Sequence, residues 1–104
     1  MKKKIVVTGG SGRFASELKK IKTNYKVIYP SKKHLDITSY GKIKNYLKKN
    51  KADYVIHLAG MSRPMKSHEK DLAQSINLNI IGTSNLVRAC SDLNIKIIYF
   101  STSY

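Results

Sequence analysis

The residues with the clearest chemical potential form a glycine-rich turn at positions 7–15, Val-Thr-Gly-Gly-Ser-Gly-Arg-Phe-Ala. An apolar run at 5–7 precedes this turn, and an apparent helix at 14–20 follows it. Glycines allow a tight turn and a close approach of the backbone to a ligand. The first turn of a helix offers free N–H groups and the positive end of its dipole to a phosphate. The order strand, turn, helix therefore predicts a dinucleotide-binding site rather than a simple connecting turn.

Basic and hydroxyl side chains near this turn indicate which dinucleotide would bind. Arg13 is either a solvated side chain at the helix start or a contact to a phosphate, including a ribose 2′-phosphate. NAD-binding domains often place an acidic residue after the second strand, to hold the ribose 2′-hydroxyl. This sequence has Ser31, Lys32 and Lys33 there instead. We therefore predict NADP in preference to NAD; in the alternative, these lysines are loop residues that bind nothing.

Two further groups follow strand-like segments. Ala59 ends the segment at 54–59 and Gly60 follows it, and together they would let a cofactor lie close to the backbone. The hydroxyl-rich run 101–104 follows the segment at 95–100, where an open α/β sheet binds its ligands. A hydroxyl there would donate to a substrate carbonyl or cap the next turn. His57, Arg63 and His68 are either substrate contacts or structural and solvated residues, and no group of side chains has the spacing of a metal site.

The segments that must position these groups alternate between strands and helices. This alternation predicts a doubly wound Rossmann-type α/β fold, with parallel strands in the order 3-2-1-4 and helices on both faces. Thr38 or Ser39 is the expected cap of the second helix. The predicted strands are Lys4–Thr8, Tyr25–Tyr29, Tyr54–Ala59 and Ile95–Phe100, and the predicted helices are Phe14–Lys20, Tyr40–Lys49 and Asp71–Leu93.

Apolar side chains recur at helical spacing in the second and third helices and predict their buried faces. Cys90 is expected to be a small buried apolar residue, and Asn94 to end the third helix. The expected inward residues of the second helix are Ile43, Tyr46 and Leu47; those of the third are Leu72, Ile76, Ile80, Val87 and Cys90, widened by Ile81, Leu86, Ala89 and Leu93.

Composition limits the class of protein further. The 104 residues suffice for one small domain, and no apolar run is long enough to span a membrane. The single cysteine excludes an internal disulfide and fits a cytoplasmic location. The net charge of +14 comes mainly from lysines spread along the chain, with short clusters at Lys2–Lys4 and Lys48–Lys51 that contain no interleaved aromatic residue. We therefore expect a solvated basic surface with some preference for anionic ligands, and no nucleic-acid partner.

With these segments in place, the chain resembles the amino-terminal part of an extended short-chain dehydrogenase/reductase, the group of NAD(P)-dependent sugar-nucleotide epimerases, dehydratases and reductases. Residues 8–15 resemble the group's TGxxGxxG loop, with Ala15 in place of the last glycine. Residues 79–83, Asn-Ile-Ile-Gly-Thr, match its NxxGT segment. The run at 34–38 is similar to reductases of 4-keto-6-deoxy sugars such as dTDP-4-dehydrorhamnose reductase.

The resemblance implies a role for individual residues. It implies that Asp36 and Ile37 contact the adenine, that residues 57–60 line the nicotinamide side, and that Asn79 supports the active site. The end of the fourth strand would supply the catalytic hydroxyl, from Thr102 or, in reserve, Ser103. The cofactor-binding residues expected from the loops and the resemblance together are Gly9, Ser11, Gly12, Arg13, Phe14, Ser31, Lys32, Asp36, Ile37, Leu58, Ala59, Gly60 and Asn79.

The family's Tyr-x-x-x-Lys pair, which supplies the general acid/base, does not occur in these 104 residues. We therefore expect residues 1–104 to be an incomplete dinucleotide-binding domain, inactive alone, of an enzyme that transfers a hydride to or from a nucleotide-linked sugar. The alternative is a non-catalytic dinucleotide-binding or interaction module. The apolar strand at 95–100 would lie at the sheet border, which predicts marginal stability and a homodimer or aggregate formed through that edge.

Overall fold

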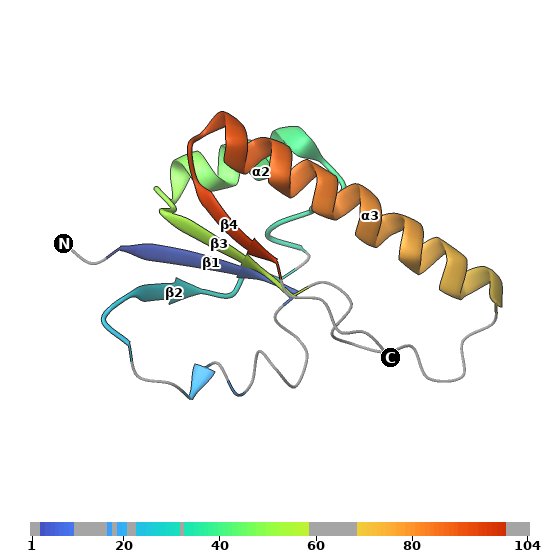
Figure 1. Ribbon diagram of the computed structural model, residues 1–104, viewed down its shortest axis with the longest axis horizontal. Helices are drawn as coiled ribbons and strands as arrows, with labels where there is room; N and C mark the ends of the chain where they lie inside the picture. Colours follow the sequence, from blue (N-terminus) through green and yellow to red (C-terminus); the bar gives the residue numbers. More distant parts are fainter. Residues whose placement is uncertain are drawn as a thin grey trace.

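Four parallel strands and two helices make up the part of the chain that is described in the structure, a computed structural model (Figure 1). The described residues are 3–9, 17, 19–20, 23–31, 33–58 and 69–99, with the backbone alone for 69–79. The strands are β1 (Lys4–Thr8), β2 (Lys26–Ile28), β3 (Tyr54–His57) and β4 (Lys96–Tyr99), and the helices are α2 (Tyr40–Lys49) and α3 (Glu69–Asp92).

The strands lie in the order β2-β1-β3-β4, and every neighbouring pair is parallel. The parallel α/β fold of Rossmann type is confirmed, but the predicted order 3-2-1-4 is wrong, because β3 pairs with β1 rather than lying outside β2. The crossover rule fixes the hand of each connection and not the side to which the chain moves. Val6 and Val7 of β1 are adjacent, so their side chains point to opposite faces of the sheet, and both are fully buried, as in a parallel sheet covered on both faces.

Local sequence explains the limits of α2. Ser39 has extended backbone angles (φ −119°, ψ 109°), and its hydroxyl accepts a hydrogen bond from the Lys42 N–H, as an N-cap does. Lys48 and Lys49 lie in the last turn, where their positive charge interacts favourably with the negative end of the helix dipole. Ile43 and Leu47, four residues apart, are buried, so the predicted bounds and inward face are confirmed.

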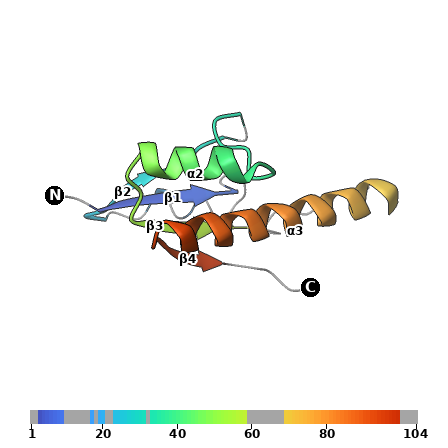
Figure 2. The same ribbon diagram turned by 90° about the horizontal axis from the view of Figure 1, so that it is seen from above.

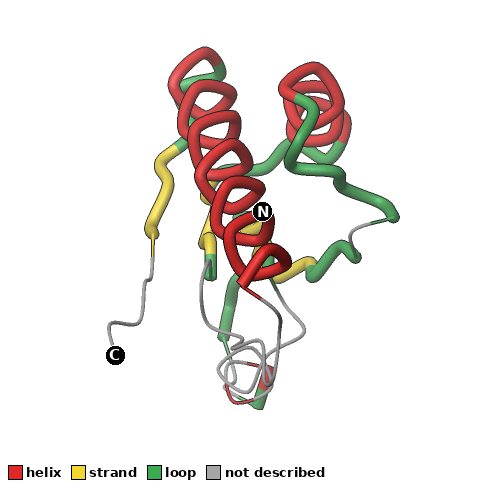
Figure 3. Tube along the Cα trace, turned by 90° about the vertical axis from the view of Figure 1, so that its right-hand side faces the viewer, coloured by secondary structure: helices red, strands yellow, loops and turns green. Residues whose placement is uncertain are grey.

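Helix α3 packs beside α2 on one face of the sheet, and its amino-terminal half extends beyond the sheet (Figures 1, 2 and 3). Leu86 and Cys90 are buried as predicted, and Asn94 follows the helix in a left-handed conformation (φ 57°). The predicted burial of Ile80, Ile81 and Val87 is wrong, since these side chains are 62%, 47% and 46% exposed. Leu86, Ala89 and Cys90 are buried in the core and Leu93 packs against it, as predicted, and Gly82 is buried as well.

The core lies mainly between these two helices and the sheet. Its central side chains are Val6, Val55, Ile43, Leu47 and Leu86, each at most 1% exposed. On the opposite face of the sheet, Val7 and Leu58 form a smaller buried cluster. Within the described residues, no helix is long and apolar enough to cross a membrane. Most of the predicted helix at 14–20 lies outside those residues.

Candidate functional site

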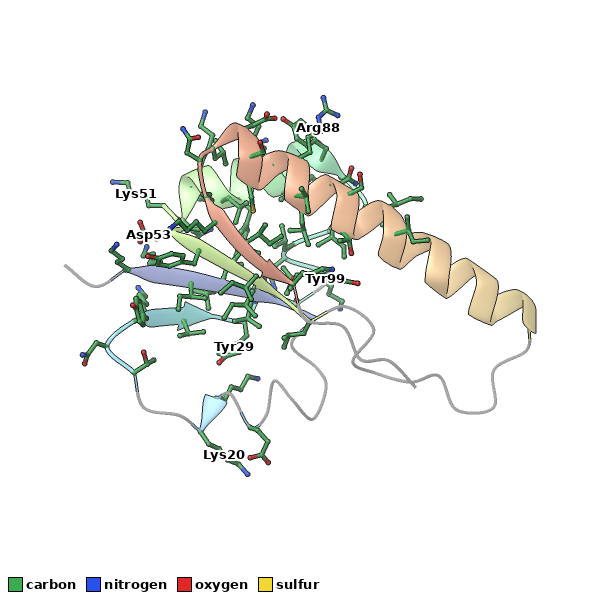
Figure 4. All side chains as sticks on the ribbon, in the orientation of Figure 1. Lys20, Tyr29, Lys51, Asp53, Arg88 and Tyr99 are labelled. Carbon is green, nitrogen blue, oxygen red and sulfur yellow. The ribbon has the colours of Figure 1, made fainter. Side chains whose placement is uncertain are left out.

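The carboxyl ends of β1, β3 and β4 meet at one edge of the sheet. The register pairs Thr8 with His57 and His57 with Tyr99. The Leu58 N–H donates to the Thr8 carbonyl oxygen at 3.0 Å, which extends the pairing of β1 and β3 past the last strand residue. Tyr99 lies at this edge, whereas Lys51 and Asp53 lie at the opposite end of the sheet (Figure 4). Parallel α/β sheets bind their ligands at the carboxyl ends of their strands, and in this chain that is the end that carries Tyr99.

Gly9 begins the glycine turn in a conformation that favours glycine. Its φ is +75°, and a Cβ on this residue would lie 3.0 Å from the backbone oxygen of Leu58. A residue with a side chain would therefore be strained in its own backbone and would also press on β3. In dinucleotide-binding loops, the first glycine makes the tight turn that follows the first strand. Gly9 makes this turn after β1, so Thr8 and Gly9, called the glycine corner below, fit a dinucleotide-binding site.

Next to this corner, His57 is buried, with 2% of its surface exposed. Its Nδ1 lies 2.6 Å from the Thr8 hydroxyl oxygen, and its Nε2 lies 3.0 Å from the Thr83 hydroxyl oxygen. Burial lowers the pKa of His57 from 6.5 to about 4, so the ring is neutral at pH 7. A neutral imidazole donates from one nitrogen and accepts at the other, and both hydroxyls can take the matching role.

The three residues Thr8, His57 and Thr83, called the Thr–His–Thr bridge below, join β1, β3 and α3. The sequence predicted His57 as a substrate contact or a structural residue, and the family resemblance placed residues 57–60 on the nicotinamide side, but neither paired it with Thr8 or Thr83. The available signal was a histidine in an otherwise apolar strand, beside a strand that ends in threonine. The Tyr99 ring lies over the same histidine, with 5.6 Å between the ring centroids.

The loop before α2 carries Asp36 and Ile37, which are expected at the adenine. The Asp36 carboxylate accepts hydrogen bonds from the Thr38 hydroxyl (2.5 Å) and the Thr38 N–H (3.0 Å). The hydroxyl bond is the main reason that the pKa of Asp36 lies below its ordinary value, with the backbone bond second. This carboxylate therefore stabilises its own turn.

Helix α3 contacts this loop through two residues that lie one helical turn apart. The Asn85 side-chain amide donates to the Ile37 carbonyl oxygen at 3.0 Å. Gly82 faces the Ile37 side chain, where an added Cβ would lie 2.7 Å from Cγ1. Gly82 is thus needed for space and not for an unusual backbone angle. The same turn of α3 contacts the expected adenine side through Gly82 and Asn85. Through Thr83 it contacts His57, which in turn bonds the threonine of the glycine corner.

Ser31 follows β2 at the same edge. Its hydroxyl oxygen lies 2.8 Å from the His34 Nδ1, and its carbonyl oxygen accepts from the His34 and Leu35 N–H groups. Ser31 and Lys33 are exposed to solvent. Leu58 is buried, with its side chain in the smaller cluster beside Val7. A ligand at this edge would therefore meet the backbone of Leu58 rather than its side chain.

Several expected site residues lie outside the described residues: Ser11, Gly12, Arg13, Phe14, Lys32, Ala59, Gly60, Thr102 and Ser103. Asn79 lies in α3, and its side chain is not among those described. The roles of these residues stay predictions. Among the described residues, no group of three or more His, Cys, Asp or Glu side chains could hold a metal ion.

Comparison with known families decides the classification. The family described as "RmlD substrate binding domain" matches residues 2–104. The chain belongs to the RmlD substrate binding domain family. Two curated relatives of this RmlD-family chain are GDP-6-deoxy-D-talose 4-dehydrogenase of Aggregatibacter actinomycetemcomitans, 31% identical over 96% of the chain, and GDP-L-colitose synthase of Yersinia pseudotuberculosis, 30% identical over 92%. The chain spans only 35% and 34% of their lengths.

Solved structures agree with the fold of the RmlD-family chain. A dTDP-4-dehydrorhamnose reductase ortholog from Clostridium acetobutylicum is 32% identical, with a TM-score of 0.72 over 90% of this chain and 34% of that one. The Bacillus anthracis dTDP-4-dehydrorhamnose reductase in complex with NADP matches with a TM-score of 0.80 over 95% of this chain and 36% of that one. At 24% identity, this second likeness concerns the fold alone.

Proposed function

We propose that this chain binds NADP and forms the cofactor-binding part of a reductase or dehydrogenase that acts on a nucleotide-linked sugar. The observation that carries the proposal is the left-handed corner at Gly9, packed against the Leu58 backbone at the carboxyl end of β1. Family membership supports the proposal, as do the sugar-nucleotide enzymes among its relatives. A GDP-L-fucose synthetase from Naegleria fowleri, 26% identical with a TM-score of 0.68 over 93% of this chain and 30% of that one, was solved bound to NADP.

In this proposal each predicted residue has a place along the dinucleotide. The glycine turn and the helix after it hold the pyrophosphate, and the hydroxyl of Ser31 and the ammonium of Lys32 hold the 2′-phosphate. The Asp36–Ile37 loop lies at the adenine, and the backbone of 58–60 lies along the nicotinamide side. The proposed pyrophosphate ligands are Gly9, Ser11, Gly12 and Phe14, Arg13 is a further charged partner of the 2′-phosphate, and Asn79 supports the active site.

The bound cofactor would supply hydride transfer to or from a sugar carbon. This chain's own residues would orient the reacting sugar. The Thr102 hydroxyl, or Ser103 in reserve, would donate a hydrogen bond to the sugar oxygen and stabilise charge that develops there. Whether the net reaction is a reduction, an epimerisation or a dehydration depends on groups that lie elsewhere.

We also propose that residues 1–104 form one incomplete dinucleotide-binding domain of a cytoplasmic, homodimeric enzyme. Ile98 and Tyr99 of the border strand β4 are about half exposed (48% and 50%), which supports association through this side of the sheet. Light scattering on the chain tests the proposed association: a monomer peak at high concentration together with cooperative melting would contradict the proposed homodimer.

Calorimetric titration with NADPH and NADH tests the cofactor proposal. We expect NADPH to bind more tightly, and we expect Arg13→Ala and Lys32→Ala to reduce that preference by about tenfold each, because each removes a charged partner of the 2′-phosphate. Lys33→Ala is the matched control, since it removes a neighbouring exposed lysine outside the proposed site. Equal affinities for NADPH and NADH, unchanged by the two site variants, would contradict the NADP assignment.

The same titration separates the two classes of function. Binding of NADPH without turnover by any longer form of the protein would favour a non-catalytic dinucleotide module. Salt-sensitive binding of DNA without affinity for either dinucleotide would contradict both the enzyme hypothesis and the non-catalytic dinucleotide-binding hypothesis.

A further inference from the structure

Polar side chains are rare in the described core, and they are concentrated at one point. Thr8 and His57 are the buried polar residues of the described part of the chain, at 3% and 2% exposed. No buried side-chain nitrogen or oxygen in that part lacks a hydrogen-bond partner. A buried polar group without partners costs about 1–3 kcal/mol, so this pair is stable only when the surrounding elements are correctly placed.

We propose that His57 is a positioning residue: it fixes the Thr8–Gly9 corner relative to helix α3, and Thr83 thereby sets the affinity of the corner for the dinucleotide. This inference rests on the proposed function. It adds that a residue of α3 without a predicted ligand contact controls cofactor binding through the Thr–His–Thr bridge.

The bridge constrains position in a way that an apolar contact does not. Apolar side chains pack with little directional preference, whereas each hydrogen bond to the imidazole has a preferred direction and a short length. The 2.6 Å contact to Thr8 and the 3.0 Å contact to Thr83 lie on the two different ring nitrogens. A displacement of α3 therefore moves the ring, and the ring moves the residue that immediately precedes Gly9.

The corner has little freedom to absorb such a movement elsewhere. The Leu58 N–H already binds the Thr8 carbonyl, and the Leu58 carbonyl lies against Gly9. Both groups belong to the residue that follows His57. The backbone of β3 and the side chain of His57 therefore hold the corner together.

The adjacent positions of α3 extend this arrangement to the other end of the expected cofactor path. Gly82 and Asn85 hold Ile37 by close packing and by a hydrogen bond. Residues 82–85 thus include both the contact of α3 to His57, which bonds Thr8 at the glycine corner, and its contacts to the loop expected at the adenine. A helix that carries both contacts can keep the two regions at a constant separation.

Thr83→Val is the decisive variant, because valine keeps the shape of threonine and removes only the hydroxyl. We expect the NADPH dissociation constant to rise about fivefold, the equivalent of one hydrogen bond, at a temperature where circular dichroism shows the chain fully folded. His57→Phe should weaken binding at least as much, and adding Thr83→Val to it should have no further effect. Leu86→Ala is the control: it creates a cavity beside the same helix and leaves all three side chains of the bridge and their hydrogen bonds unchanged in type.

A second measurement does not depend on cofactor binding. In the ligand-free chain, Thr83→Val should shift the amide resonance of Gly9 in a ¹⁵N–¹H spectrum, and Leu86→Ala should leave it in place. If wild-type chain does not bind NADPH, the proposed function fails, and the Gly9 resonance alone decides the positioning role. If Thr83→Val only lowers the melting temperature, as Leu86→Ala does, and changes neither affinity nor the Gly9 resonance, the inference is overturned. Thr8→Val replaces His57→Phe if the latter does not fold.

Discussion

Two glycine–threonine pairs meet at His57, one at the end of β1 and one in α3. At the end of β1, Thr8 precedes Gly9; in α3, Gly82 precedes Thr83. In both pairs the threonine hydroxyl contacts the buried imidazole, at 2.6 Å and 3.0 Å. The glycines differ. Gly9 has a φ of +75°, whereas Gly82 lies in a regular helix.

This difference separates two reasons for a glycine that look alike in a sequence. At Gly9 both the backbone angle and the nearby Leu58 carbonyl exclude a side chain, and backbone cannot move aside cheaply. At Gly82 only the side chain of Ile37 is in the way, and that side chain can adjust or be shortened. The stability lost by a substitution at Gly9 should therefore not be restored by a second substitution. The stability lost at Gly82 should be restored when the Ile37 side chain is shortened.

The largest effect is expected for Gly9→Ala. The left-handed backbone and the 3.0 Å approach to the Leu58 oxygen should together lower the free energy of unfolding by about 4 kcal/mol. Urea denaturation measures the change, with NADPH titration on any folded fraction. A stability within about 0.5 kcal/mol of wild type would show that the corner tolerates a side chain.

The second prediction concerns the imidazole that both pairs share. The pKa of His57 is about 4 in the folded chain, against an ordinary value of 6.5, so the unfolded chain binds more protons as the pH falls between these values. The stability that the neutral ring provides is complete above pH 6.5. It should be lost at about 1.4 kcal/mol per pH unit down to pH 4, about 3 kcal/mol in all.

Urea denaturation at several pH values tests this slope, and His57→Phe serves as the comparison because it removes the titrating group. The pKa of Asp36 is lowered from 3.8, so its contribution is lost only below this window. A wild-type slope equal to that of His57→Phe between pH 4 and 6.5 would mean that the buried ring does not titrate as described.

A smaller effect is expected for Gly82→Ala. Crowding of Ile37 costs about 2 kcal/mol, and the better helix propensity of alanine returns about 1, so the net loss should be about 1 kcal/mol. Ile37→Ala removes both the Cδ1 and the Cγ1 atoms nearest to the new methyl group and should remove the crowding cost of Gly82→Ala in a double-mutant cycle. Strictly additive effects of the two substitutions would show that Ile37 is not the obstacle.

The smallest effect is expected for the same substitution in open space. No atom lies within 4 Å of a Cβ added to Gly41, which is exposed in α2. Gly41→Ala should raise the free energy of unfolding by about 0.5 kcal/mol, through helix propensity alone. Thermal and urea unfolding measure it, and a decrease in stability would weaken the distinction between conformation and space drawn for the other two glycines.

Local chemistry made much of this fold predictable from the sequence. The hydroxyl of Ser39, the lysines of the last turn and the spacing of Ile43 and Leu47 define α2, and its predicted bounds are those observed. The order of the strands was not predictable in the same way, because either side of β1 satisfies the handedness of a crossover. Exposure of Ile80 was missed because periodicity locates a stripe on a helix but not the point where the helix leaves its neighbours.

The candidate site shows the same division. The glycine corner was predictable because strand, turn and helix are continuous in the sequence. The Thr–His–Thr bridge was not, since its members lie 49 and 26 positions apart along the chain and belong to three elements. No short pattern records such a contact; only the pairing of β1 with β3 and the packing of α3 bring the three side chains together.

Cys90, buried on the inner face of α3, has a practical consequence. It is the single cysteine of the sequence, 1% exposed, and burial raises its pKa to about 11. Thiolate is the form that alkylating reagents attack, so the native thiol should be almost inert at neutral pH. Its rate of modification by iodoacetamide then measures how often the helix opens, read as one mass increment. Cys90 of the wild-type chain is therefore a natural probe of local unfolding, and no label has to be introduced.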